Sequence, residues 1–217
     1  MPSSPAPTPP PRTGFDAVVI AASLGGPRAL AEVLAPLPAE FPAPIFVAQH
    51  LAERSPGFLP TMLARWTALD VVCARDGERP RAGAVYLAPP GRHLLLSAAG
   101  RCLLSDGARV NYARPSADLL FLSAAKTFGV RALGVVLTGK LSDGAAGAEA
   151  IRRAGGAVLV QAPETCRAPD MPLATMRRGA ANIALPPSSL AAALTALVAV
   201  PGARDLFGIG AGRAAAA

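Results

Sequence analysis

Short apolar segments alternate with stretches of helical periodicity along most of this chain. The apolar segments are rich in Val, Ile and Leu and lack the alternating polar positions of a sheet that faces water on one side. They cover residues 17–22, 45–49, 69–74, 84–88, 133–138, 157–161 and 182–185. Continuous apolar runs of this length are typical of parallel strands that are buried on both faces.

Helical patterns fill several of the intervals between these segments. They cover residues 27–34, 56–66, 116–128, 145–154 and 188–198, and Pro27 and Pro56 suit the first turns of their helices. Residues 93–96 and 101–104 flank a Ser-Ala-Ala-Gly loop, which predicts a β-hairpin. The order of these elements predicts an α/β domain with a mostly parallel sheet, in which ligands bind at the carboxyl ends of the strands.

Length and composition limit the domain organisation and the location. The 217 residues suit one domain, which we place at 14–200, between a Pro-rich N-terminal tail expected to be disordered (1–13) and a flexible C-terminal tail (201–217). No apolar run approaches the roughly 18 residues of a membrane span and no signal peptide is visible, so we expect no membrane insertion. The three cysteines are widely spaced, which suits a reducing compartment and indicates the cytoplasm.

The net charge of +7 comes almost entirely from arginine. These arginines are scattered, and aromatic residues make up only 5% of the chain, so the basic, aromatic surface of a nucleic-acid-binding protein is not expected. A compositional bias of the source genome accounts for the arginine content. The alternative is a basic surface that attracts an acidic protein partner.

A serine follows the first predicted strand in a turn flanked by glycines. Residues 21–26 read Ala-Ala-Ser-Leu-Gly-Gly and lead into a predicted helix at Pro27. A hydroxyl at such a strand-to-helix turn faces solvent, and N–H groups at the start of the helix can donate to an oxyanion. Ser23 is therefore a candidate nucleophile. Two alternatives are a helix N-cap and a phosphate-binding glycine loop.

Two more candidate residues end predicted strands. His50, one of two histidines, follows the second strand, and an imidazole can take a proton from a serine hydroxyl near neutral pH. The alternative for a histidine at a strand end is a structural or merely exposed residue. Asp143 precedes an Ala-rich helix, where it suits either the N-cap of that helix or a carboxylate that orients the histidine. We interpret His93 as a loop or hairpin residue, with a role near the site as the alternative. Because parallel strands bring their carboxyl ends to one edge, nucleophile, base and orienting carboxylate are expected to converge there.

Residues 134–140 match the G-x-x-x-x-G-K pattern of a phosphate-binding loop. The middle residues of that motif must form a loop, and a Ser or Thr follows its Lys. Here the middle reads Val-Val-Leu-Thr, a strand, and Leu141 follows Lys140. We therefore do not expect nucleotide binding.

The candidate residues lie in segments that resemble the catalytic domain of the chemotaxis protein-glutamate methylesterases (CheB-type). Residues 21–26 resemble the family's G-A-S-x-G-G turn, Gln49-His50 resembles its Q-H pair, and residues 137–144 (Leu-Thr-Gly-Lys-Leu-Ser-Asp-Gly) resemble its L-T-G-M-G-x-D-G loop. Supporting segments lie at 86–90, 114–118 and 171–172. The similarity extends from about residue 15 to about residue 198.

This resemblance implies a doubly wound α/β sheet with a small antiparallel β-hairpin, and no cofactor or metal. It also implies hydrolysis of glutamate γ-methyl esters on the cytoplasmic helices of a methyl-accepting chemoreceptor, with release of methanol, and in some members deamidation of glutamines. The implied site consists of Ser23, His50 and Asp143 as the catalytic residues and Leu24, Gly25 and Lys140 around the oxyanion and substrate.

The chain departs from the family pattern in regulation and in one loop. The family usually carries a receiver domain, but only 13 residues precede the domain here, so we expect constitutive activity or control by a separate regulatory protein. Lys140 and Leu141 replace the usual Met and Gly. Lys140 either places a cation near the developing charge or points to solvent. Two alternative functions are an esterase or amidase with another protein substrate and a catalytically silent module that binds signalling proteins.

Overall fold

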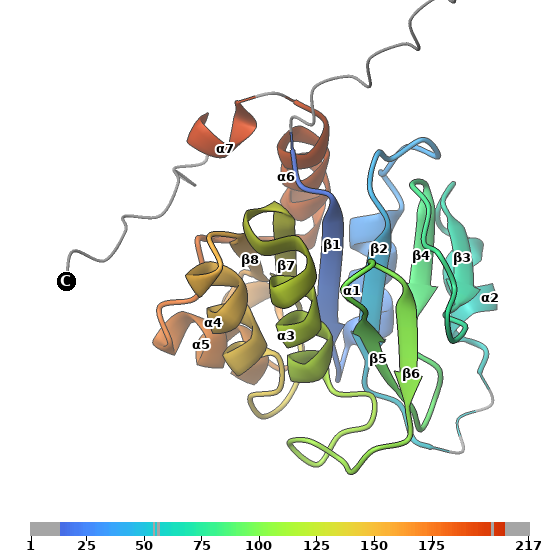
Figure 1. The fold of residues 1–217 in the computed structure, drawn as a ribbon. Helices are drawn as coiled ribbons and strands as arrows, with labels where there is room; N and C mark the ends of the chain where they lie inside the picture. Colours follow the sequence, from blue (N-terminus) through green and yellow to red (C-terminus); the bar gives the residue numbers. More distant parts are fainter. Residues whose placement is uncertain (1–13, 54, 56, 201, 207–217) are drawn as a thin grey trace, which may run out of the picture.

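A seven-stranded parallel sheet between two layers of helices forms the body of the protein (Figure 1). The computed structural model describes residues 14–53, 55, 57–200 and 202–206. In spatial order the strands are β3 (Asp70–Cys73), β4 (Ala84–Leu87), β2 (Ile45–Gln49), β1 (Ala17–Ala22), β7 (Ala132–Val136), β8 (Ala157–Gln161) and β9 (Ile183–Leu185). β5 (His93–Leu96) and β6 (Cys102–Ser105) form a separate antiparallel hairpin. The predicted fold class is therefore confirmed.

Helices cover both faces of the sheet. α1 (Gly26–Leu34), α2 (Leu59–Ala64) and α6 (Pro187–Ala199) pack on one face, while α3 (Ala117–Phe128), α4 (Ala145–Arg153), α5 (Asp170–Arg177) and the hairpin pack on the other. The short α7 (Ala203–Leu206) follows α6, and two 3₁₀ turns lie at Gly129–Arg131 and Pro163–Thr165. Within β1, Ile20 contributes to one core and Val19 to the other, which explains why the strand is apolar at every position.

The connections reverse direction at the centre of the sheet. From β1 the chain passes through α1 to β2 on one side, and from β7 it passes through α4 to β8 on the other. α1 and α4 lie on opposite faces, so their starts diverge and leave a crevice at the carboxyl ends of β1 and β7. No helix in the described part of the chain is long and apolar enough to cross a membrane.

Several predicted boundaries were wrong. The helix predicted at 56–66 is only α2, whose first-turn proline is Pro60, and Pro56 lies outside the described residues, as do 1–13 and most of 201–217. β7 ends before Thr138, because Thr138 donates its N–H to the Gln161 side chain rather than to a strand. The sequence pattern also missed α5, a short helix with Pro172 in its first turn.

Candidate active site

Strand register places Ser23 beside His50. Ala22 pairs with Gln49 across β1 and β2, so the residues that follow them leave neighbouring strands at the same level, where adjacent strands lie about 4.8 Å apart. The His50 N–H donates to the Ala22 carbonyl at 2.9 Å. The Ser23 N–H donates to the Thr138 carbonyl at 3.0 Å, which attaches the loop after β7 to the same edge.

Side chains and a close backbone approach hold the Ser23 turn in place. Gln49 Nε2 donates to the Ser23 carbonyl at 2.9 Å, and Thr138 Oγ1 donates to the Leu24 carbonyl at 2.9 Å. Gly25 adopts the left-handed conformation (φ 86°) that starts α1. A Cβ atom at Gly139 would lie 2.7 Å from Ser23 Cβ, so only glycine lets this loop pack against the serine.

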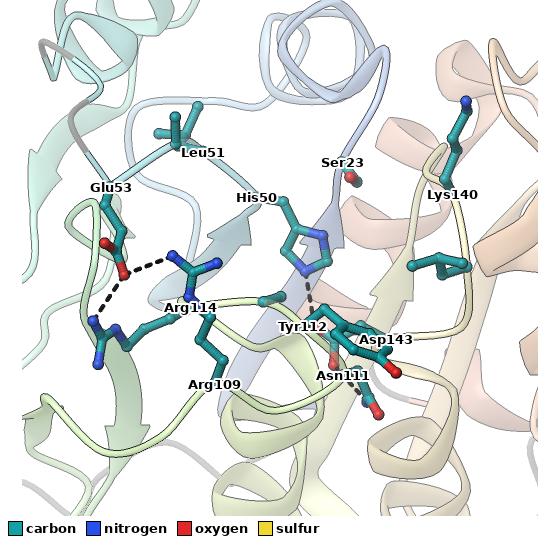
Figure 2. A pocket seen from close by; sticks show the side chains of 13 residues that line it. Ser23, His50, Leu51, Glu53, Arg109, Asn111, Tyr112, Arg114, Lys140 and Asp143 are labelled. Carbon is teal, nitrogen blue, oxygen red and sulfur yellow. Dashed lines mark hydrogen bonds and ion pairs between the residues drawn. The ribbon is translucent and has the colours of Figure 1, made fainter.

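The His50 imidazole lies between Ser23 and Asp143 (Figure 2). Its Nε2 is 2.7 Å from Asp143 Oδ2, and the two side chains are 19% and 1% exposed, respectively. Because a carboxylate accepts, Nε2 carries the proton, and Nδ1 is the ring nitrogen with a free lone pair. Among the described residues, no hydrogen bond joins the Ser23 hydroxyl to His50; such bonds are often long without substrate.

The Asp143 carboxylate accepts hydrogen bonds from five groups. The donors are His50 Nε2 at 2.7 Å, Ala117 N–H at 2.6 Å, Ser116 Oγ at 2.8 Å, Asp118 N–H at 3.1 Å and Asn111 Nδ2 at 3.2 Å. Burial alone would raise the pKa of Asp143, but the hydrogen bonds from His50, Ala117 and Ser116 outweigh it and hold the pKa below its usual value. The carboxylate is therefore charged at neutral pH.

One interpretation of the sequence placed Asp143 at the N-cap of the helix that follows it. The structure shows that Asp143 does not cap this helix. The N-cap of α4 is Gly144, which makes no side-chain cap bond, and a first-turn N–H of α4, that of Gly147, is bound by Asp118 instead. The Asp143 carboxylate instead lies at the start of α3, where it binds the N–H groups of Ala117 and Asp118. This position adds the positive end of the α3 dipole to the groups that stabilise its charge.

Behind Asp143 lies a second layer of polar side chains. Fully buried His93 accepts the Ser116 N–H at Nδ1 (3.1 Å), and its Nε2 donates to the Ala108 carbonyl (3.0 Å). His93 is thus a hairpin residue, as predicted, that supports the start of α3. Asn111 Nδ2 contacts Asp118 Oδ2 at 2.7 Å as well as Asp143. Burial raises the pKa of Asp118, and the neighbouring Asp143 charge adds to the rise.

A cavity of about 290 Å³ opens over Ser23, His50 and Asp143 (Figure 2). On one side, Glu53 Oε1 binds Arg109 at 3.0 Å and Arg114 at 2.8 Å, and these guanidinium groups hold the pKa of Glu53 below its usual value. Lys140 also lines the cavity. The predicted catalytic residues therefore share one pocket with a mainly cationic wall.

The residues expected around the oxyanion, Leu24, Gly25 and Lys140, lie in the turns next to Ser23. Within the described ranges, their three backbone N–H groups have no hydrogen-bond acceptor. The adjacent N–H groups of Ser23 and Gly139 are already bound to the carbonyls of Thr138 and Ala168. Leu24 and Lys140 therefore offer unused donors on the two loops that flank the serine.

The sequence did not indicate the roles of several supporting residues. Gln49 belongs to the Gln49-His50 motif, and its side chain also donates a hydrogen bond to the Ser23 carbonyl. Ser116 and Asp118 stand at a predicted helix start, a signal that could have indicated a cap, whereas nothing local indicated Asn111. In the described part of the chain, no group of three or more His, Cys, Asp and Glu side chains could hold a metal ion.

Comparison with known proteins places this site in a family. Residues 18–194 match the model of the CheB methylesterase family. A "protein-glutamate methylesterase/protein-glutamine glutaminase 2" of Anaeromyxobacter dehalogenans is 47% identical over 84% of this chain and 53% of its own length. "Protein-glutamate methylesterase FrzG" of Myxococcus xanthus is 42% identical over 86% of this chain and 55% of its own length. The chain thus spans about half the length of these curated relatives.

A solved structure agrees with the sequence comparisons. The CheB methylesterase catalytic domain of Thermotoga maritima superposes with a TM-score of 0.81 and 37% identity, over 85% of this chain and 99% of that one. The family match over residues 18–194 includes Ser23, His50 and Asp143, which lie after β1, β2 and β7. The chain belongs to the CheB methylesterase family.

Proposed function

We propose that this protein is a serine hydrolase that removes methyl groups from glutamate γ-methyl esters of a methyl-accepting chemoreceptor, or of a similar methylated signalling protein in the cytoplasm. The observation that carries the proposal is the His50–Asp143 hydrogen bond of 2.7 Å beside Ser23 in one pocket. The names of the relatives support the substrate class.

The geometry supports a two-step acyl transfer. Ser23 Oγ attacks the ester carbonyl while His50 Nδ1 takes its proton, and the negative charge passes to the carbonyl oxygen. The N–H groups of Leu24 and Lys140 are suited to bind this oxyanion, and one such donor contributes about 3 kcal/mol. His50 then protonates the departing methoxide, which leaves as methanol. Asp143 stabilises the imidazolium in between.

The second step hydrolyses the acyl-enzyme and regenerates the free Ser23 hydroxyl. Water gives a proton to His50 Nδ1 and attacks the acyl-enzyme carbonyl. The Ser23 Oγ–acyl bond then breaks, His50 returns the proton to Ser23 Oγ, and the glutamate carboxylate is released. The same steps applied to a glutamine amide would release ammonia, the activity that "glutaminase" in the relatives' names denotes. No part of either step requires a group beyond the chain and water.

Mass spectrometry of a methylated chemoreceptor fragment, with and without the protein, tests this function. We expect a loss of 14 mass units (a CH₂) per hydrolysed ester, measured as the difference in peptide mass, and equimolar methanol. Ser23→Ala and His50→Ala should each remove both the reaction and labelling by a fluorophosphonate. Ser189→Ala, at an exposed position on α6, is the matched control and should react as the wild type does.

The same experiment separates the alternatives. Fluorophosphonate labelling without any loss of methyl groups would indicate a serine hydrolase with another substrate. Absence of both, together with intact receptor binding, would indicate a silent binding module. Either outcome refutes the proposed methylesterase function.

A further inference from the structure

Backbone strain in the described residues is concentrated around the candidate active site. Three residues other than glycine have a positive φ there: Asn111 (51°), Tyr112 (64°) and Leu141 (66°). All three line the pocket above Ser23. A left-handed backbone is costly for a residue with a Cβ atom, and least so for Asn. Strain of this kind persists where the surrounding structure holds it, and it clusters at functional sites.

The Asn111 side chain explains its own conformation, because it binds Asp118 and Asp143. The positive φ of Tyr112 belongs to a tight turn, because Val110 and Ala113 exchange backbone hydrogen bonds of 3.1 and 2.9 Å across Asn111 and Tyr112. The Leu141 N–H donates to Asp170 Oδ2 at 3.4 Å. Neither of these bonds explains why the Tyr112 and Leu141 side chains face solvent. Tyr112 is 90% exposed and Leu141 is 63% exposed, so neither gains by burial in the free protein. Leu141 also stands where the family loop motif has glycine, the residue that tolerates this φ at no cost. Both positions therefore hold apolar side chains in solvent at the pocket mouth despite an unfavourable backbone.

The size of the pocket indicates what these side chains contact. About 290 Å³ lies at the small end of ligand pockets, which run from roughly 300 to 1,000 Å³, so the cavity suits one extended side chain. When a protein is the substrate, its remaining surface must lie on the rim. Tyr112 comes from the loop between β6 and α3, and Leu141 from the loop after β7, so the rim offers apolar contacts from two separate loops.

We propose that Tyr112 and Leu141 form a docking surface for the polypeptide segment that carries the ester, through apolar contacts beside the modified glutamate. The proposal rests on the proposed function and deepens it by naming what the site recognises beside the ester. An exposed tyrosine supplies a large contact area with little loss of side-chain entropy. Lys140 and Arg109, which line the same pocket, make this rim compatible with acidic neighbours of the ester.

Binding measured without turnover tests the docking surface. The probe is a methylated cytoplasmic fragment of a chemoreceptor, and the protein carries Ser23→Ala so that it binds without hydrolysis. Adding Tyr112→Ala or Leu141→Asn should raise the Kd about tenfold each. Adding Leu103→Ala, at a 41% exposed leucine of β6 that does not line the pocket, is the control and should change the Kd less than about twofold.

A structural role for these residues would give a different result. Asparagine tolerates the left-handed backbone at position 141, so Leu141→Asn should melt at the same temperature as the parent protein or above it. With Ser23 intact, the rate of labelling by a small fluorophosphonate should fall much less than the affinity for the receptor fragment.

Three outcomes would overturn the docking surface. One is an unchanged Kd in both variants, and another is no measurable binding of the fragment by the Ser23→Ala protein. The third is an equal loss of fluorophosphonate labelling, which would show that the pocket itself had been distorted. Failure of the wild type to release methanol refutes the proposed function separately, since the Kd comparison does not depend on turnover.

Discussion

Asp118 and Asp143 each bind the start of the helix associated with the other. Asp143, just before α4, accepts the N–H groups of Ala117 and Asp118 at the start of α3. Asp118, in the first turn of α3, accepts the N–H of Gly147 in the first turn of α4 at 2.7 Å. This exchange places each carboxylate at the positive end of a helix dipole. The position of the candidate orienting residue is thus part of the packing of α3 against α4.

Replacing Asp143 by Asn should damage both the reaction and the fold. The amide nitrogen would face groups that donate hydrogen bonds, so His50 loses its orienting acceptor and a buried donor at the start of α3 loses its partner. We expect the rate of methanol release to fall on the order of 10³–10⁴-fold. The free energy of unfolding in urea should fall by about 1–3 kcal/mol. Asp205→Asn, at an exposed position, is the control, and an Asp143→Asn rate near the wild-type value would exclude the orienting role.

The two carboxylates should affect the pH dependence of stability in opposite directions. The pKa of Asp143 is lowered, so its contribution is present above the usual value of 3.8 and is lost as the pH falls through its folded pKa. The pKa of Asp118 is raised, so the native state binds more protons there than the unfolded state, and this contribution to stability falls as the pH rises from 3.8 through the folded pKa.

The Asp118→Asn variant isolates the contribution of Asp118 to the pH dependence of stability. Because the variant lacks the titrating group, its free energy of unfolding minus that of the wild type should become more positive as the pH rises from about 4 to 7. Urea unfolding at several pH values measures this difference. A difference that stays level or declines over this range would contradict a raised pKa at Asp118.

Gly139 should not tolerate even one added methyl group. A Cβ atom there would lie 2.0 Å from Met171 Sδ and 2.7 Å from Ser23 Cβ. Gly139→Ala should therefore displace Ser23, slow its labelling by a fluorophosphonate on the order of 10²-fold and destabilise the fold by about 1–3 kcal/mol. Gly107→Ala is the matched change at an exposed position with more space, where the nearest side-chain atom, Ser105 Oγ, would be 3.2 Å from the added Cβ atom. Equal labelling of the two variants would refute the close approach.

Alkylation of the cysteines should not affect the reaction of Ser23. Burial raises the pKa of Cys102 to about 12 and that of Cys166 to about 11, and it also raises the pKa of Cys73. Few thiolates are therefore present at pH 8, and iodoacetamide should react more slowly than with a free cysteine peptide. Ser23 labelling by a fluorophosphonate should survive this treatment. Rapid inactivation that a methylated receptor fragment prevents would instead indicate a thiol in the site.

Much of the fold is encoded locally. Continuous apolar runs predict strands covered on both faces, and Gly25 and Pro27 after β1 predict the turn that holds Ser23 outside the sheet. Because parallel strands share one edge for their carboxyl ends, the positions of Ser23, His50 and Asp143 after three strands were enough to predict that they meet. The short α2 and α5 were harder, because one turn or two of helix leaves little periodicity to detect.

By itself, the sequence determined the strand pattern, the serine turn and the residue types at the three strand ends, because each depends on near neighbours in the chain. Only the tertiary structure decided that Asp143 caps α3 rather than α4, that Asn111 joins two buried carboxylates, and that Tyr112 and Leu141 stand in solvent at the same pocket. The partners of a carboxylate and the exposure of a side chain depend on how separate elements pack. That packing brings together residues about 30 positions apart, such as Asn111 and Asp143, which no local pattern connects.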